Sequence, residues 1–364
     1  MNEKRFWTHL DGKIIAVSFA LVTMGIVNLY SATSGTPEFG FAFYQRQLLW
    51  FGIGAVVALA VCWLDYRYYE QFAYVLYLVA LLFLGLVLVY GMMVGGVQRW
   101  IKIGGFAFQP SELMKIALIL GLARYFVRHE RNEYELRHLA VPLSMMLVPT
   151  LLIARQPDLG TAFILIVIFF SLVLFVKIRL KSLMILAVIV LLATPMLWFS
   201  VKEYQRSRIL TFLNPDRDPL GAGYHIIQSK IAVGSGGIWG KGYREGTQCK
   251  LQFLPERHTD FVFAVLGEEW GFAGCAVVLT AYLALILFGL NVAAKAKDRY
   301  GALTAFGVTA MMFWHTVVNV GMVLGMMPVV GLPLPFLSYG GSFAIANALG
   351  IALLLNVGAR RYIF

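Results

Sequence analysis

Asp260 is the residue of this sequence best placed to do chemistry. It follows the long polar stretch over 200–259 and precedes the apolar run Phe261-Val262-Phe263-Ala264. A carboxylate at such a boundary is either a solvated group at a helix end or a reactive group beside a lipid-facing cavity. A buried carboxylate without a cation is protonated or binds something positive. Both interpretations of Asp260 stay open at this point.

Glu112 and Lys115 form the second candidate site. Their spacing of three places them on one helix face, near the start of an apolar segment. They are either an internal ion pair that fixes helix packing or the floor of a polar cavity. Asp158 poses the same choice, because an acid directly after Pro157 also suits the positive end of a helix.

Further polar residues lie inside apolar segments. Glu268 and Glu269 follow Asp260 by about two helical turns, which places Glu268 roughly 12 Å further into a continuous helix. His315 and Asn319 are four residues apart and share a face, so interhelical hydrogen bonding is their favoured role. No spacing of His, Cys and Asp indicates a metal site, so a divalent cation is an unassigned candidate.

Two polar segments are candidates for binding an anion. The stretch over 331–342 is dense in glycine and proline, which predicts a fixed re-entrant loop, either with free N–H groups or as a structural plug. The stretch over 200–259 is basic, which suits either lipid headgroups or an anionic ligand such as a phosphate. Its basic residues include Arg206, Arg208, Lys230, Lys241 and Arg257.

Long apolar runs must position these residues. The chain has 364 residues, is 60% hydrophobic and has a mean hydropathy of +0.75, which indicates an all-α polytopic membrane protein. We treat residues 1–364 as one membrane domain that contains one large loop over 200–259, with a short amphipathic helix near 224–233. The ten predicted spans are 13–30, 46–63, 72–91, 110–127, 138–153, 159–176, 182–199, 260–289, 302–326 and 342–358.

The distribution of basic residues predicts the topology. One set of short loops carries Arg124, Arg128, Arg131 and Arg137, and the other set is poor in basic residues. The positive-inside rule therefore predicts that both termini are cytoplasmic. Under this topology Glu112, Lys115, Asp158, Asp260 and the 331–342 loop all open on the outer side. Because basic residues occur on both faces, the net charge of +11 does not indicate nucleic acid as a partner.

A series of short polar and glycine-rich motifs follows in order along nearly the whole chain. The motifs are Arg99-Trp100-Ile101, Gln109-Pro110-Ser111-Glu112 with Lys115, Gln156-Pro157-Asp158-Leu159-Gly160-Thr161, Arg208, Phe212-Leu213-Asn214-Pro215, Gly223-Tyr224, Gln228-Ser229, His258-Thr259-Asp260-Phe261, Gly267-Glu268-Glu269, Gly331-Leu332-Pro333 and Ser338-Tyr339-Gly340-Gly341-Ser342. In these motifs and their order the chain resembles the SEDS family (shape, elongation, division and sporulation), and the RodA branch is a closer match than the FtsW branch. Phe343 departs from the family pattern, since many members have a small residue there.

The resemblance implies a peptidoglycan glycosyltransferase of the bacterial inner membrane that acts in elongation and cell shape. Its substrates would be lipid II and polyprenyl-linked glycan, with polymerisation on the extracytoplasmic side. Its partners would be a class B penicillin-binding protein, which is a transpeptidase, other membrane proteins of the elongation complex and membrane lipid. Asp260 falls on the family's essential aspartate. The remaining site candidates, for substrate binding, are Glu112, Lys115, Asp158, Arg208, Arg99, Trp100, His258, Ser338, Gly340 and Ser342.

The implied reaction needs two kinds of group. An α-linked pyrophosphate donor and a β-1,4 product require inversion, so a base must take the proton from the acceptor hydroxyl, and Asp260 is that candidate. The undecaprenyl pyrophosphate leaving group needs positive charge, from Arg208, Lys115 or a divalent cation such as Mg²⁺ or Mn²⁺. Two alternatives are a transporter that flips lipid II and a non-enzymatic scaffold of the wall-synthesis complex.

Overall fold

The computed structural model describes residues 8–33, 40–94, 97–103, 106–200, 203–215, 221–251, 253–254 and 256–361. In these ranges, each of the ten predicted spans falls on a helix, which confirms the all-α membrane architecture. The long helices are α2 (Gly12–Thr33), α3 (Gly40–Trp63), α4 (Tyr66–Tyr90), α5 (Pro110–Arg128), α6 (Ala140–Arg155), α7 (Leu159–Phe175), α8 (Leu180–Ser200), α12 (Val262–Ala294), α13 (Arg299–Val323) and α14 (Gly341–Arg360).

The helices have the surface of a multi-span membrane protein. Among the described residues, seven helices are long and apolar enough to cross a bilayer, and α7 and the described part of α8 are apolar but shorter. Large apolar side chains are exposed on the outside of the bundle, such as Leu82 on α4 and Leu283 on α12. Exposed apolar surface of this extent is typical of helices that face lipid.

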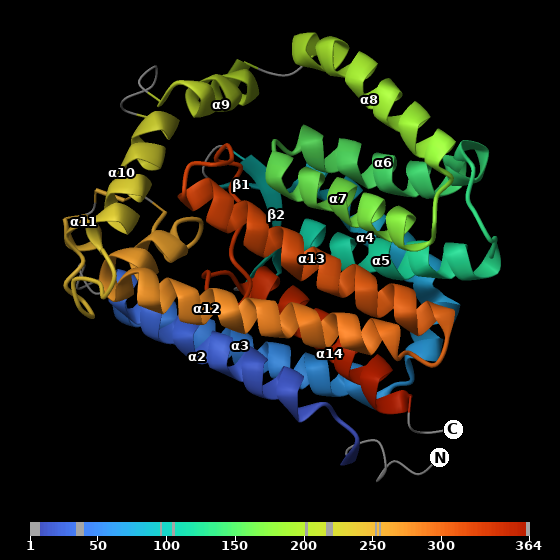
Figure 1. Cartoon of the computed structure of the whole chain (residues 1–364), viewed down its shortest axis with the longest axis horizontal. Helices are drawn as coiled ribbons and strands as arrows, with labels where there is room; N and C mark the ends of the chain where they lie inside the picture. Colours follow the sequence, from blue (N-terminus) through green and yellow to red (C-terminus); the bar gives the residue numbers. More distant parts are fainter. Residues whose placement is uncertain are drawn as a thin grey trace.

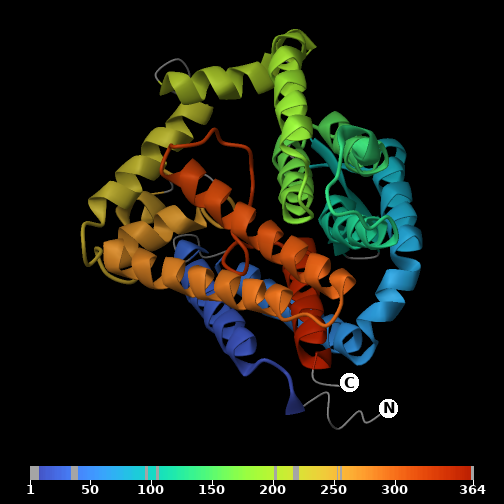
Figure 2. The same cartoon turned by 45° about the vertical axis from the view of Figure 1, so that its right-hand side comes forward.

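The interior of the bundle is formed by α5, α13 and α14. Helix α13 packs against α5, α7, α12 and α14, while α3 packs on α14 and α2 on α12 (Figure 1). Most side chains of α5 are buried, including Glu112 and Lys115. The C-terminal end of helix α8 projects above the bundle in both views, and α8 contacts the short helix η1 (Leu136–Leu139) (Figure 2).

A small antiparallel sheet, which the sequence pattern did not predict, precedes α5. Strands β1 (Met92–Val94), β2 (Val97–Ile103) and β3 (Phe106–Phe108) are hydrogen-bonded in that order. Trp100 lies opposite Met92, and Ile101 lies opposite Phe108. The sheet folds the segment between α4 and α5 back on itself, so that Arg99 is held close to the start of α5.

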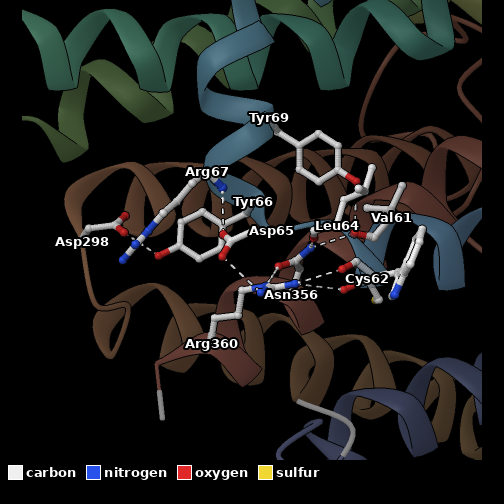
Figure 3. A network of polar contacts seen from close by, with 11 residues as sticks. Val61, Cys62, Leu64, Asp65, Tyr66, Arg67, Tyr69, Asp298, Asn356 and Arg360 are labelled. Carbon is white, nitrogen blue, oxygen red and sulfur yellow. Dashed lines mark hydrogen bonds and ion pairs between the residues drawn. The ribbon is translucent and has the colours of Figure 1, made fainter. Parts of the chain in front are cut away.

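A buried polar network closes the end of α3 (Figure 3). Asn356 on α14 donates to the carbonyls of Val61 (2.8 Å) and Leu64 (2.7 Å). Arg360 donates to the carbonyls of Cys62 (3.5 Å) and Trp63 (3.2 Å), and it pairs with Asp65 at 3.1 Å. The last carbonyls of a helix have no partner within the helix. Two side chains of α14 therefore supply the donors that α3 needs.

The long polar segment contains helices α9 (Glu203–Leu213), α10 (Ala222–Ser235) and α11 (Thr247–Lys250). Helix α10 confirms the short helix predicted near 224–233. The prediction of one continuous span from 260 is wrong, because Gly271 (φ 63°, ψ −162°) breaks α12 into a segment over 262–270 and a longer one over 272–294. The apolar run continues through the break, so hydrophobicity alone gives no sign of it.

Candidate active site

Asp260 lies in the turn that leads into α12, and its side chain is partly buried. Its backbone N–H donates to the carbonyl of Glu256 (3.1 Å), and its carbonyl accepts from Asn319 Nδ2 (2.9 Å). The same Asn319 amide donates to the carbonyl of Leu332 (2.7 Å). Asp260 is therefore tied by its backbone to helix α13 and to the loop over 331–340.

The loop over 331–340 makes further bonds to the residues before Asp260. Ser338 Oγ donates to the carbonyl of Thr259 (2.6 Å), and the N–H of Tyr339 donates to the carbonyl of His258 (2.9 Å). Gly331 has a φ of +70°, and a Cβ added there would lie 3.4 Å from Asp260 Oδ2. The stretch over 331–340 is irregular, as its glycines and prolines predicted, and Ser338 serves in it as a support for the Asp260 turn.

Charged groups from four segments act on the Asp260 carboxylate. Burial raises its pKa to about 6, because it disfavours the charged form, and the negative charges of Glu256 and Asp158 add to this rise. The positive charges of Arg99 and Arg208 oppose it. Two cations, one from β2 and one from the segment over 203–213, thus act on Asp260, and a pKa of about 6 suits a general base.

Asp158 and Arg99 form one side of this cluster. Asp158 caps helix α7 by accepting from the backbone N–H of Thr161 (3.1 Å), as the helix-start interpretation expected. It also accepts from Gln109 Nε2 (3.2 Å) and pairs with Arg99 at 3.4 Å. Asp158 is buried, whereas the Arg99 side chain is 29% exposed. Arg99 is therefore oriented by a buried carboxylate and keeps donors available for a ligand.

Arg208 approaches the cluster from α9. Its guanidinium donates to the carbonyl of Val329 (3.2 Å), just before the 331–340 loop, and its side chain is partly buried. Trp100, the neighbour of Arg99 on β2, is paired with Met92 across the sheet. The structure thus brings Arg99 and Arg208 to Asp260 and gives Trp100 a place in the adjoining sheet.

Glu112 and Lys115 are a buried ion pair with an N–O distance of 2.8 Å. Lys115 Nζ also contacts His315 Nε2 (2.9 Å) and lies over the Phe343 ring (5.1 Å to the centroid). His315 Nδ1 lies 3.3 Å from the carbonyl of Pro333. With Lys115 only 1% exposed, these contacts favour the packing interpretation, in which the pair supports the 331–340 loop from below.

The remaining predicted residues connect the loop to its surroundings. Gly340 N–H donates to Gln47 Oε1 (3.1 Å), and Ser342 Oγ accepts from the N–H of Gln109 (3.0 Å). The His258 ring contacts the rings of Phe43 and Tyr339. Burial lowers the pKa of the His258 imidazole, because it disfavours the charged form.

The structure corrects the placement of Glu268. This buried side chain accepts from Lys241 Nζ (2.7 Å) and from the backbone N–H of Gln248 (3.0 Å). Both partners belong to the long polar segment, and the break at Gly271 separates Glu268 from the longer part of α12. Glu268 thus fastens that segment to α12 and is not a deep group of a continuous span.

Two residues in the site were not assigned to it from the sequence. Asn319 was expected to make interhelical bonds, but it donates to the backbone at Asp260 and Leu332. Glu256 influences Asp260 through charge and through its carbonyl. A polar side chain in an apolar helix was a visible signal for Asn319. In the described part of the chain, no three His, Cys, Asp or Glu side chains are grouped as a metal site.

Comparison with known proteins places the chain among related membrane proteins. A family model described as cell cycle protein, for FtsW, RodA and SpoVE, matches residues 12–363. The peptidoglycan glycosyltransferase MrdB of Escherichia coli is 41% identical, over 99% of this chain and 97% of that protein. Stage V sporulation protein E of Bacillus subtilis is 36% identical, over 96% of this chain and 97% of its own length.

Solved structures give the same relationship. A chain from a structure described as structural coordination of polymerization and crosslinking by a peptidoglycan synthase complex is 36% identical, with a TM-score of 0.83 over 97% of this chain and 98% of that one. The rod shape determining protein RodA of Thermus thermophilus is 31% identical, with a TM-score of 0.74 over 98% of this chain and 99% of that one.

Proposed function

This chain belongs to the FtsW/RodA/SpoVE family, and on that premise we propose that it is a peptidoglycan glycosyltransferase that polymerises lipid II into glycan strands. Relatives named peptidoglycan glycosyltransferase cover nearly the whole chain, including MrdB of Escherichia coli and RodA of Treponema pallidum, the latter 34% identical over 97% of this chain. The arrangement of Asp260 with two arginines from separate segments supports this chemistry best.

Asp260 acts as the general base. A sugar hydroxyl must lose its proton as it attacks the anomeric carbon, and a carboxylate with a pKa of about 6 is mostly ionised at pH 7 and retains basicity. The proton passes from the acceptor 4-hydroxyl to the carboxylate while the bond from the anomeric carbon to the pyrophosphate oxygen breaks. The acceptor oxygen enters on the opposite face, so the α-linked donor gives a β-1,4 link.

Arg99 and Arg208 receive the leaving group. The developing charge of a polyprenyl pyrophosphate needs fixed positive charge nearby, and guanidinium groups bind phosphate oxygens with two N–H donors. Both arginines already act on the Asp260 carboxylate, so one ligand can lie between the base and the cations. Trp100 and His258 flank this space as candidate contacts for the sugar.

Five of the candidate residues stabilise the conformation of the site: Glu112, Lys115, Ser338, Gly340 and Ser342. Their bonds run to each other, to the side chains of His315 and Gln47 or to the backbone of neighbouring segments, and their polar atoms are mostly buried. They contribute to substrate binding indirectly, because they hold the loop over 331–340 in one conformation.

The enzyme works at the extracytoplasmic side of the bacterial inner membrane. The charge bias of the short loops places both termini in the cytoplasm, and the polar segment over 200–259 then lies outside with Asp260. A class B penicillin-binding protein would crosslink the glycan made here, within an assembly of other elongation proteins. The chain from a peptidoglycan synthase complex that this fold matches supports that partnership.

The function is tested with purified protein, labelled lipid II and the penicillin-binding partner. Glycan ladders on a gel that appear with wild-type protein and disappear with Asp260→Asn support the proposal. A folded wild-type complex that makes no glycan would contradict it, and assays of lipid II movement across vesicles would then test the transport alternative.

A further inference from the structure

An exposed apolar projection lies beside the break in α12. Ile238 is 64% exposed and Trp239 is 82% exposed, and Phe272, at the start of the longer part of α12, is 71% exposed. These are large apolar side chains, and none of the bonds of the active site involves them. Such surface in water is unfavourable by about 25 cal/mol per Å², so it indicates something apolar that covers it.

The projection is held rigidly against α12 by its backbone. The N–H groups of Phe272 and Ala273 donate to the carbonyls of Gly237 (2.9 Å) and Ile238 (3.0 Å). The N–H groups of Lys241 and Gly242 donate to the carbonyls of Glu268 (3.0 Å) and Glu269 (3.0 Å). Ile238 and Trp239 are therefore fixed at the level of the first turn of the segment over 272–294.

Glycines make this close backbone contact feasible. Gly240 (φ +80°) and Gly271 (φ +63°) adopt left-handed conformations, and a Cβ on either would overlap backbone atoms of the other segment. A Cβ on Gly236 would overlap the carbonyl of Gly267 in the same way. The glycine-rich run over 234–242 thus allows its backbone to pack directly against the backbone of α12 near Gly271, and its apolar side chains remain exposed.

We propose that Ile238 and Trp239 form a membrane anchor that inserts into the lipid boundary next to the start of the segment over 272–294. Three observations favour lipid as the occupant. The exposed surface continues along α12 through Phe272, Val277 and Leu283, which is the surface that a bilayer covers. Tryptophan is a favoured residue at the membrane interface, and the charged residues Lys241, Arg244 and Glu245 follow directly on the water side.

The anchor sets the depth of the catalytic turn. Its backbone bonds reach Glu268 and Glu269 in the short segment of α12, which begins two residues after Asp260. A pyrophosphate on a polyprenyl chain lies at the lipid headgroup level, so a fixed depth for Asp260 aligns the base with this substrate. This consequence rests on the proposed function, whereas the anchoring itself does not.

Spin labels in lipid nanodiscs test the anchor without any assay of activity. Single cysteines replace Trp239, Glu245 and Leu283 in full-length protein whose Cys249 is changed to serine and whose buried Cys62 and Cys275 are changed to alanine. Leu283 lies eleven residues after Phe272, about 16 Å deeper, and gives the lipid reference, while Glu245, in the same polar segment as Trp239, gives the water reference. Collision with oxygen reports lipid, and collision with a water-soluble nickel chelate reports solvent.

The proposal expects the label at position 239 to resemble the label at 283, with high oxygen and low nickel accessibility. Nickel accessibility equal to that of the label at 245 would overturn it, because the side chain would then lie in water. Low accessibility to both reagents would also overturn it, because protein would then cover the site. The label accessibilities test the anchor even if the protein fails to polymerise lipid II, so failure of the proposed function and failure of the anchor can be distinguished.

Discussion

Asn319 donates one side-chain amide to the carbonyl of Asp260 (2.9 Å) and to the carbonyl of Leu332 (2.7 Å), so a single group on α13 joins the catalytic turn to the glycine- and proline-rich loop. His315 lies one helical turn earlier on α13 and contacts Lys115 below the same loop. Helix α13 therefore acts as the common support for two segments that are far apart in the sequence.

Asn319→Leu should lower polymerisation and stability together. The substitution leaves two carbonyls without their donor, at a cost of about 1–3 kcal/mol each, and it releases Asp260 from Leu332. Asn347→Leu is the matched control, because Asn347 is buried on α14 and its Nδ2 has no partner among the described residues. The unfolding temperature and the rate of glycan synthesis are measured for both variants. Equal effects of the two substitutions would argue against a positioning role for Asn319.

The pH dependence of polymerisation should show an acidic limb near pH 6. Asp260 must be ionised to accept a proton, so kcat/KM should fall about tenfold per pH unit below its pKa of about 6. Arg208 lowers this pKa, so Arg208→Gln should move the limb to higher pH. Initial rates over pH 4.5–8 give the acidic limb for the wild-type protein and for the variant. An unchanged limb in the variant would show that the charge of Arg208 does not act on Asp260.

The ion pair of Glu112 and Lys115 should show strong coupling. Lys115→Met leaves a buried carboxylate without its cation and should cost about 3–5 kcal/mol. Glu112→Gln combined with Lys115→Met should recover part of that loss, because no isolated charge remains. A double-mutant cycle by thermal unfolding measures this coupling, and additive losses would mean that the two groups do not interact.

Arg360→Met should destabilise the junction between α3 and α4. The substitution removes the donors to the carbonyls of Cys62 and Trp63 and the partner of Asp65, at a cost of about 1–3 kcal/mol. Arg131→Met, at an exposed arginine, should change stability by about 0.5 kcal/mol or less. Similar unfolding temperatures for the two variants would contradict the capping role.

The sequence predicts the helices well because each apolar run is long enough to cross a bilayer. It misses the sheet over 92–108 because its strands are short and lie in a segment without regular alternation. The break at Gly271 is hidden because backbone contact with Gly240, more than thirty residues earlier, determines it. Hydrophobicity reports burial in lipid, and it carries no information on contacts between distant backbones.

The candidate residues could be named from their residue types and their places in the sequence, but their arrangement in space is seen only in the structure. Asp158 and Arg99 could be named from the sequence, but the sheet that brings Arg99 to Asp158 could not. Lys115 was expected to pair with Glu112, and it does. Its further contacts with His315 and Phe343 depend on how α13 and α14 pack around α5.

The most direct test of the account compares Asp260→Asn with Glu256→Gln. Both substitutions neutralise a carboxylate in the same turn, but Glu256 is exposed, acts on Asp260 through its charge and is not the proposed base. With folded protein and its partner, Asp260→Asn should lower the rate of lipid II polymerisation by about 10²–10⁴-fold, while Glu256→Gln should stay near the wild-type rate. A near-normal rate for Asp260→Asn would contradict the assignment of Asp260 as the base.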